Sequence, residues 1–232
     1  MMGKKRLLVS ALKVPCKIPG YLWWRLGLKS AFNKKVRKRI PFSYQNVVED
    51  WRIEGAALPH FSSRLYCEVK LLQKAMAERK FDKSLEIGCG YGRLTPWIME
   101  YSREHYAVEP EKRLFNDAKL LHPKANFYNT AAQKLPFPDN LFDLCVTWTV
   151  LQHIPPEEQI KAAREIKRVA KKSATIIIAE ETGTLQGETV WFRTVDDWAE
   201  LFKPWKLVWS ADRILEETAP TDHGKVMRFE NE

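Results

Sequence analysis

Residues 84–93 read SLEIGCGYGR, and this stretch decides the fold class of the chain. It joins a short apolar strand, which carries an acid near its end, to three alternate glycines. Glycine lets the backbone turn sharply and lets a ligand approach without a Cβ in the way. A helix that begins near Arg93 would also point its free N–H groups at that ligand. The stretch therefore predicts a loop that cradles a nucleotide-like molecule.

The spacing of the glycines separates this loop from the dinucleotide-binding fingerprint. The pattern G-x-G-x-x-G would place its last glycine at position 93, where this chain has Arg93. Glu86, Gly88, Gly90 and Gly92 instead form the pattern E-x-G-x-G-x-G. This pattern resembles the first motif of class I S-adenosylmethionine-dependent methyltransferases. The resemblance implies that these four residues contact S-adenosylmethionine as the cofactor.

Length and charge limit the kind of protein that this chain forms. Its 232 residues are 45% hydrophobic, which is enough for one sizeable core with a short appendage. Of the 38 Lys and Arg residues, 12 lie in residues 1–40, which hold no Asp or Glu. The remainder is slightly acidic and does not indicate a nucleic-acid groove. We therefore expect any attraction to phosphates or anionic lipids to come from residues 1–40.

The spacing of the cysteines indicates whether the chain binds a metal, and its hydropathy indicates where in the cell the protein is located. Cys16, Cys67, Cys89 and Cys145 are far apart and form no C-x-x-C pair, so neither a metal site nor a disulfide framework is predicted. The apolar run 7–12 ends at Lys13 without a cleavage site, and no stretch approaches the roughly 20 apolar residues of a membrane span. We expect a cytoplasmic protein, either free or associated with an anionic membrane surface through residues 1–40.

The chain is predicted to divide into residues 1–42 and a methyltransferase domain, residues 43–232. The first segment is basic and aromatic, and serves as a tail, a lid or an interfacial helix. Adjacent tryptophans within residues 21–38, beside dense basic charge, fit a helix at a membrane interface. They fit equally a helix that packs its aromatic face on the domain. Tyr44, Trp51 and His60 are candidate lid residues, with ordinary packing as the alternative.

Downstream of the first segment, helices and strands are predicted to alternate. Strands are expected near 83–88, 104–109, 125–129, 143–148 and 174–180, and helices near 61–80, 93–101, 111–121, 156–171 and 195–203. Such alternation predicts a parallel sheet covered on both faces. Two final strands, near 206–209 and 226–229, have no room for a helix between them and should pair antiparallel. The predicted fold is α/β, a Rossmann-like doubly wound seven-stranded sheet, mostly parallel, with an antiparallel C-terminal strand.

The strand 104–109 ends in Glu109, 17 residues beyond Gly92. A carboxylate at this place can accept both hydroxyls of a ribose, which is why acids recur here in nucleoside-binding sheets. Glu109 is therefore predicted as the ribose ligand. The alternative is a solvated acid at a strand end, or a cap for the helix that begins near Glu111.

Two further stretches extend the resemblance: residues 135–144 read LPFPDNLFDL, and residues 148–154 read WTVLQHI. The family often shows L-P-F, then F-D, then a strand that ends in V-L-x-H. In the family, an acid four residues before L-P-F usually receives the adenine amino group, but this chain has Ala131 there. The adenine contact then passes to the backbone of Ala131 and Ala132, to Gln133 or to a water. Thr147, on the fourth strand, completes the predicted cofactor residues.

The acceptor is expected at the carboxyl ends of the fourth and fifth strands. His153 acts as a base or holds an acceptor hydroxyl, unless it is a packed turn residue. Trp148 walls the acceptor pocket or fills the core. Glu180 neutralises a cationic acceptor, or only caps its strand and faces water. Arg193 receives an acidic group of the acceptor or lies at the surface.

The resemblance implies a methyltransferase that acts on a small-molecule, lipid-linked or glycan-like acceptor. The D/N-P-P-Y motif for planar amino groups is absent after the fourth strand, where residues 147–150 read TWTV. Two alternatives stay open. The altered residue at Ala131 fits a degenerate cofactor-binding module that docks through its tail. The basic tail also fits an RNA-directed methyltransferase, although the acidic remainder disfavours nucleic acid as a partner. The sequence predicts no oligomeric state.

Overall fold

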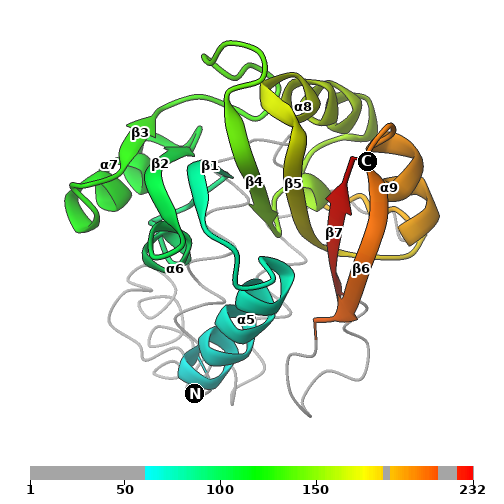
Figure 1. Ribbon diagram of the computed structural model, residues 1–232, viewed down its shortest axis with the longest axis horizontal. Helices are drawn as coiled ribbons and strands as arrows, with labels where there is room; N and C mark the ends of the chain where they lie inside the picture. The colour runs from blue at the N-terminus through cyan, green and yellow to red at the C-terminus, as the bar shows by residue number, and fades with distance from the viewer. Residues whose placement is uncertain (1–60, 185–188, 214–223, 232) are drawn as a thin grey trace, which may run out of the picture. The chain divides into compact units, whose positions relative to one another are not determined.

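Strand β1 (Phe81–Ile87) leads into the glycine loop and lies inside a seven-stranded sheet of order β3-β2-β1-β4-β5-β7-β6 (Figure 1). The residues from Ser84 to Ile87 are all buried, as in a parallel strand that is covered on both faces. The computed structural model describes residues 61–184, 189–213 and 224–231. The predicted boundary at residue 42, the segment before it and the candidate lid residues Tyr44, Trp51 and His60 lie outside the described residues.

The strands have the predicted directions. β2 (Ser102–Val108) and β4 (Phe142–Trp148) both run parallel to β1. The short edge strand β3 (Asn126–Tyr128) and the long β5 (Ala170–Glu181) extend the parallel part of the sheet. β7 (Gly224–Glu230) runs antiparallel to both β5 and β6 (Lys206–Asp212). The predicted antiparallel C-terminal strand is confirmed.

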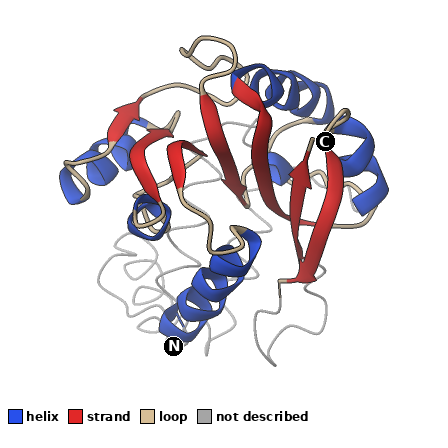
Figure 2. Ribbon diagram, in the orientation of Figure 1, coloured by secondary structure: helices blue, strands red, loops and turns tan. Residues whose placement is uncertain are grey.

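The predicted helices are also present, with shifted ends (Figure 2). α6 (Thr95–Met99), α7 (Lys112–Leu121), α8 (Pro156–Val169) and α9 (Val195–Leu201) connect the strands. α5 (Phe61–Ala75) ends earlier than predicted, because Ala77 and Glu78 adopt positive φ angles of 52° and 54° that a helix does not continue through. A short 3-10 turn, η2 (Leu151–His153), follows β4 and was not predicted.

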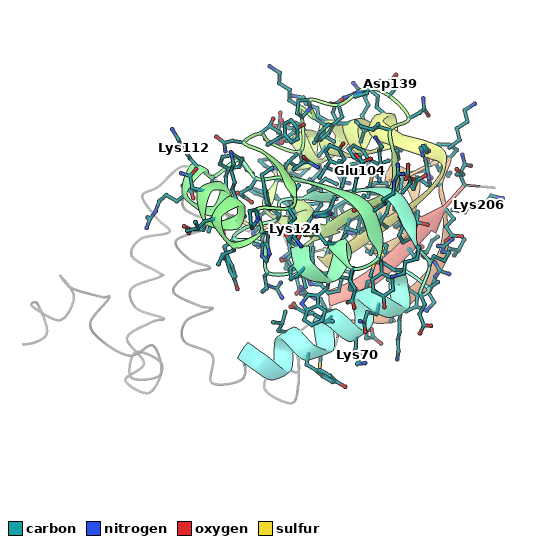
Figure 3. All side chains as sticks on the ribbon, turned by 60° about the vertical axis from the view of Figure 1, so that its left-hand side comes forward. Lys70, Glu104, Lys112, Lys124, Asp139 and Lys206 are labelled. Carbon is teal, nitrogen blue, oxygen red and sulfur yellow. The ribbon has the colours of Figure 1, made fainter. Side chains whose placement is uncertain are left out.

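Helices cover both faces of the sheet. On one face Leu72 of α5 and Ile98 of α6 share an apolar cluster with Val146 of β4. On the other face Phe202, just after α9, stacks on Phe229 of β7 with the ring centroids 5.3 Å apart. Figure 3 shows Lys70 on α5 at the bottom of the view and Asp139, in the loop before β4, at the top. The doubly wound architecture is therefore confirmed.

The order of the strands determines where a ligand can bind. The chain moves outward from β1 to β2 and β3, and then returns to place β4 on the other side of β1. In open α/β sheets the connecting loops part at such a switch point and leave a crevice at the carboxyl ends of the strands. The glycine loop after β1 lies at this point.

Candidate functional site

The glycines of the loop all adopt the left-handed conformation, with φ angles of 69° at Gly88, 58° at Gly90 and 88° at Gly92. Close packing explains why two of these positions require a residue without a Cβ. A Cβ on Gly88 would lie 2.5 Å from Val150 Cγ2, and a Cβ on Gly92 would lie 2.5 Å from His122 Cδ2. A Cβ on Gly90 would meet nothing within 4 Å. Gly90 therefore borders open space, into which a ligand can approach the backbone.

Backbone hydrogen bonds fasten the loop to the end of β2. The N–H groups of Gly88 and Cys89 donate to the carbonyl of Val108 at 2.8 and 3.1 Å. The Gly90 N–H then donates to Glu109 Oε2 at 2.9 Å. The structure thus brings together the glycine loop and the acid that the sequence singled out separately.

Glu109 presents a carboxylate that is only partly used by the protein. Its Oε1 accepts the Glu111 N–H at 2.9 Å, so each carboxylate oxygen holds one backbone bond. An ionised carboxylate has about four acceptor positions, and the pair that is left suits a cis-diol. Burial raises the pKa of Glu109 to about 7, against the lowering effect of the Glu111 and Gly90 N–H groups. The Asn129 side chain donates to the Glu109 carbonyl at 2.8 Å and fixes the peptide.

Glu86, at the end of β1, makes contacts within the protein. It is buried, and its Oε2 accepts the hydroxyl of Thr95 at 2.5 Å. The same oxygen lies 3.4 Å from Nε2 of His105, whose Nδ1 is 2.8 Å from Ser84 Oγ. Glu86 therefore ties the end of β1 to the first turn of α6. A direct contact with a cofactor stays a prediction.

A third buried acid, Glu68 of α5, holds the far end of the loop. Its Oε2 pairs with Arg93, directly after the last glycine, and its Oε1 accepts the indole N–H of Trp148 at 3.2 Å. Sequence reasoning missed this residue. The signal was present, because Glu68 stands between Leu65 and Leu72 on the apolar side of its helix, where an acid requires a partner. Trp148 is buried in the core cluster, which matches the alternative in which its side chain fills the core.

The end of β4 is shaped by the buried carboxylate of Glu180. Its Oε1 accepts the Thr147 hydroxyl at 3.1 Å and its Oε2 accepts the Gln152 N–H at 3.1 Å. Oε1 also accepts the N–H groups of Val150 and Leu151. Burial raises the pKa of Glu180 to about 7, and these donors oppose the shift. Both Glu180 and Thr147 direct their oxygens into this turn, so Glu180 caps the turn after β4 and does not face water as its predicted alternative required.

Thr149 follows β4 with a φ of 56°, which is rare for a β-branched residue. Its N–H donates to the Ala179 carbonyl at 2.7 Å, and its hydroxyl donates to the Trp148 carbonyl at 2.7 Å. Strained backbone of this kind clusters at functional sites. Here it turns the chain from β4 into η2, beside the glycine loop.

His153 is held through both ring nitrogens. Gln152 Oε1 accepts the Glu181 N–H at 2.7 Å, so the Gln152 amide must turn its NH2 group toward His153 Nε2, 3.3 Å away. Nε2 is then the acceptor, and Nδ1 carries the proton that it donates to the Thr189 carbonyl at 3.1 Å. In this arrangement His153 is a bonded turn residue, and a role as base would require these bonds to break.

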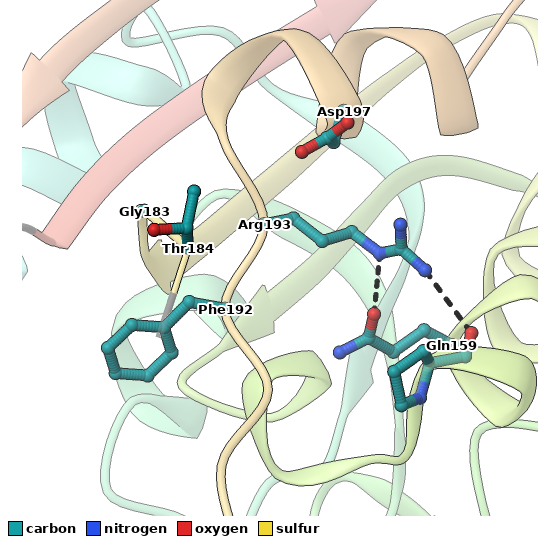
Figure 4. A pocket seen from close by; sticks show the side chains of 7 residues that line it. Gln159, Gly183, Thr184, Phe192, Arg193 and Asp197 are labelled. Carbon is teal, nitrogen blue, oxygen red and sulfur yellow. Dashed lines mark hydrogen bonds between the residues drawn. The ribbon is translucent and has the colours of Figure 1, made fainter. Parts of the chain in front are cut away.

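Arg193 lines a cavity of about 220 Å³ beside β5 (Figure 4). Its Nε donates to Gln159 Oε1 at 2.5 Å, and its NH2 group donates to the Pro156 carbonyl at 3.2 Å. Gln159 is buried and also donates to the carbonyls of Leu151 and Trp191 at 3.0 Å. The cavity is therefore tied through Gln159 to the turn at the end of β4.

Ala131 and Ala132 lie in a turn after β3. The predicted adenine contact would use the backbone groups of these two residues. The Lys134 N–H donates to the Ala131 carbonyl at 3.1 Å, which closes the turn, and Ala132 is buried. The adenine contact itself stays a prediction.

The described residues contain no group of three or more His, Cys, Asp or Glu side chains that are placed to hold a metal ion. Within the same ranges, no helix has both the length and the apolar character needed to cross a membrane. The Cys89 thiol in the glycine loop is buried, and burial together with the charges of Glu86 and Glu109 raises its pKa well above the usual value. This thiol is therefore expected to stay protonated and unreactive.

The raised pKa of Glu109 predicts a pH-dependent stability. A carboxyl whose pKa rises from 4.5 to about 7 on folding stabilises the protein below pH 4.5, and this contribution is lost as the pH rises through 7. Urea unfolding of Glu109→Gln and of the parent chain, at pH values between 5 and 8, isolates the effect. We expect the variant to gain on the order of 1–3 kcal/mol relative to the parent between pH 5 and 8. A constant difference across this range would contradict the burial argument.

Comparison with known proteins finds a family model that matches part of the chain. Residues 85–178 match the model of the family described as "Methyltransferase domain". An uncharacterized methyltransferase of Schizosaccharomyces pombe is 34% identical over 115 residues, which are 44% of this chain and 41% of the relative. The ajmaline N-methyltransferase of Rauvolfia serpentina is 31% identical over 108 residues, which are 44% of this chain and 36% of that enzyme. The chain thus spans less than half the length of either relative.

Solved structures share the fold. The N-methyltransferase NodS of Bradyrhizobium japonicum, in complex with S-adenosyl-L-homocysteine, superposes with a TM-score of 0.64 at 15% identity, covering 77% of this chain and 90% of NodS. A Pyrococcus horikoshii protein gives a TM-score of 0.62 at 18% identity, covering 75% and 92%. The sequence match begins on β1, continues through the glycine loop and Glu109, and ends on β5. The chain therefore carries a match to a methyltransferase domain over residues 85–178, and it has the fold that NodS shows.

Proposed function

We propose that this protein transfers a methyl group from S-adenosylmethionine to a small-molecule, lipid-linked or glycan-like acceptor. One observation carries the proposal: Glu109, buried at the end of β2, accepts the Gly90 N–H at 2.9 Å and keeps acceptor positions beside the open space at Gly90. That combination suits a nucleoside whose ribose lies against the carboxylate and whose remainder follows the loop.

The residues at the crevice fit the cofactor. Glu109 would accept the ribose hydroxyls, and the loop around Gly90 would face the rest of the molecule without a side chain in the way. Ala131 and Ala132 would offer backbone groups to the adenine. When bound, S-adenosylmethionine supplies a methyl group that its sulfonium has already activated. The protein then needs chiefly to orient an acceptor in line with that group and to exclude water, because proximity provides much of the acceleration.

Two observations support an acceptor other than a planar amino group of a base or of glutamine. Residues 147–150 read TWTV where enzymes for such acceptors carry D/N-P-P-Y, and Thr147 is turned into the fold by its bond to Glu180. The name of the ajmaline N-methyltransferase states a small-molecule acceptor for that relative. Association with an anionic membrane through residues 1–40 stays a prediction from the charge of that segment.

Isothermal titration calorimetry with S-adenosylmethionine and S-adenosylhomocysteine tests the proposal. We expect both to bind, and we expect Glu109→Gln to weaken both by about tenfold or more, because a charged acceptor of hydrogen bonds is lost. Glu104→Gln provides the matched control, since Glu104 lies on β2, the strand that Glu109 follows, is more exposed, and accepts the Tyr106 hydroxyl. Failure of the parent chain to bind either compound would refute the proposed function.

A further inference from the structure

We infer that the cavity at Arg193 receives the carboxylate of a monoanionic acceptor. This inference rests on the proposed function and deepens it, because it names the chemical class of the molecule to be methylated. The cavity has a volume of about 220 Å³, which accommodates a small organic acid. It lies apart from the glycine loop, at the end of β5, where Gly183 donates its N–H to the Arg193 carbonyl at 3.0 Å.

The guanidinium of Arg193 is oriented by neutral groups and makes no ion pair with a described carboxylate, although the charge of Asp197 in the same cavity is close enough to interact with it. Its Nε and NH2 groups bond to two neutral partners, the Gln159 amide and the Pro156 carbonyl. Within the described part of the chain, no carboxylate lies within 4.0 Å of this guanidinium, and no hydrogen bond uses its NH1 group. An arginine held in this way presents planar, charged donors, which match the geometry of a carboxylate.

Buried groups set the orientation of the Arg193 guanidinium. Gln159 is fully buried, and its amide nitrogen is already committed to the carbonyls of Leu151 and Trp191. Its oxygen is consequently left to accept from Arg193. The Trp198 ring lies under the guanidinium, 5.8 Å from its central carbon, and restricts it from the other side. The charge is therefore positioned before any ligand arrives.

The other lining residues define which anion fits. Asp197 borders the same cavity, and its pKa is lowered chiefly by hydrogen bonds from Thr194, so it is ionised at neutral pH. One cation and one anion then share the space, and a ligand with two negative charges such as phosphate would be repelled. Phe192 and Pro156 add apolar surface, and Thr184 adds a hydroxyl. A single carboxylate on an apolar body suits this lining better than phosphate.

The cavity also lies where an acceptor is needed. The Trp191 N–H donates to the Gln152 carbonyl at 2.7 Å, so the segment that carries Arg193 packs along the turn after β4. That turn begins at Val150, the residue in contact range of Gly88 in the cofactor loop. The Arg193 cavity and the cofactor crevice therefore share one edge of the sheet, its carboxyl edge.

Benzoate and benzamide provide a matched pair of probes, because they have the same shape and differ in charge. We would titrate each, and inorganic phosphate, into nitrogen-15-labelled protein saturated with S-adenosylhomocysteine, and follow the Gln159 side-chain amide by NMR. We expect benzoate to bind at least about tenfold more tightly than benzamide or phosphate. Arg193→Gln should remove this preference, and Arg193→Lys, which keeps the charge without the planar fork, should reduce it several-fold. Arg164→Gln, an exposed arginine of α8, should retain it.

Each other outcome overturns the inference. Equal binding of benzoate and benzamide, binding of neither, or a preference for phosphate would exclude a carboxylate site. A preference that survives Arg193→Gln would place the charge elsewhere. Calorimetry of S-adenosylhomocysteine on the same samples separates the two proposals: if it binds and benzoate does not, only the acceptor class is wrong. If S-adenosylhomocysteine itself fails to bind, the proposed function is wrong as well.

Discussion

Gly90→Asp is expected to abolish measurable binding of S-adenosylmethionine while the protein stays folded. A Cβ at this position meets no protein atom within 4 Å, so a side chain there starts out into the space beside the loop. The φ of 58° is one that aspartate tolerates better than most residues, which keeps the cost to the backbone small. The new side chain would occupy the ligand's space and bring a charge close to Glu109, whose Oε2 lies 2.9 Å from the Gly90 nitrogen.

The measurement is calorimetric titration of S-adenosylmethionine, with thermal unfolding recorded on the same sample. We expect a loss of affinity above about 100-fold. Gly90→Ala adds only a methyl group and should give a smaller loss in the same direction. Asn140→Asp is the matched control, because it introduces the same charge at a φ of 56° in an exposed turn. Unchanged affinity in Gly90→Asp would show that the loop does not hold the cofactor.

The features that the sequence predicted correctly depend on local pattern. The glycines of the loop, the apolar strand before them and the acid at the end of the next strand lie close together in the chain, and each follows from the backbone geometry that it must adopt. Gly90 and Glu109 meet because the ends of neighbouring parallel strands meet. The sheet and the contact between Gly90 and Glu109 could therefore be predicted, and the binding of a cofactor by these residues stays a prediction.

The acceptor side depends on partners that are distant in the sequence. Glu180 caps a turn about 30 residues upstream, and Arg193 is oriented by Gln159, 34 residues away. Nothing local distinguishes a carboxylate that caps a turn from one that faces a ligand, since both follow an apolar strand. The short turn η2 was missed for the same reason, because its N–H groups are satisfied by a side chain from the adjacent strand.

Glu68→Ala is expected to lower the free energy of unfolding by about 3–5 kcal/mol, the range measured when one partner of a buried ion pair is removed. Glu68 is fully buried and the Arg93 side chain is 9% exposed, so the guanidinium would lose its counter-charge where water cannot replace it. The indole N–H of Trp148 would lose its acceptor as well. Urea unfolding monitored by circular dichroism measures the change.

The control is Glu200→Ala, which breaks the Glu200–Lys203 pair on the surface. Those side chains are 71% and 67% exposed, and such pairs contribute about 0–1 kcal/mol. The double variant Glu68→Gln/Arg93→Gln removes both charges and leaves an amide that can accept the Trp148 indole. It should therefore be more stable than Glu68→Ala. If Glu68→Ala and Glu200→Ala cost the same, the Glu68 pair is not buried as described.

The same variants test whether α5 supports the cofactor loop. Arg93 directly follows Gly92, so Glu68 holds the end of the loop through the one side chain that anchors it to α5 among the described contacts. Glu68→Gln should weaken S-adenosylmethionine binding by several-fold, whereas Glu200→Ala should leave it unchanged. Because Gln can still accept from Trp148, a loss of affinity in Glu68→Gln reports on Arg93 and the loop. Equal affinity in the two variants would leave Glu68 with a role in stability alone, and would mean that the glycine loop keeps its shape through its bonds to β2.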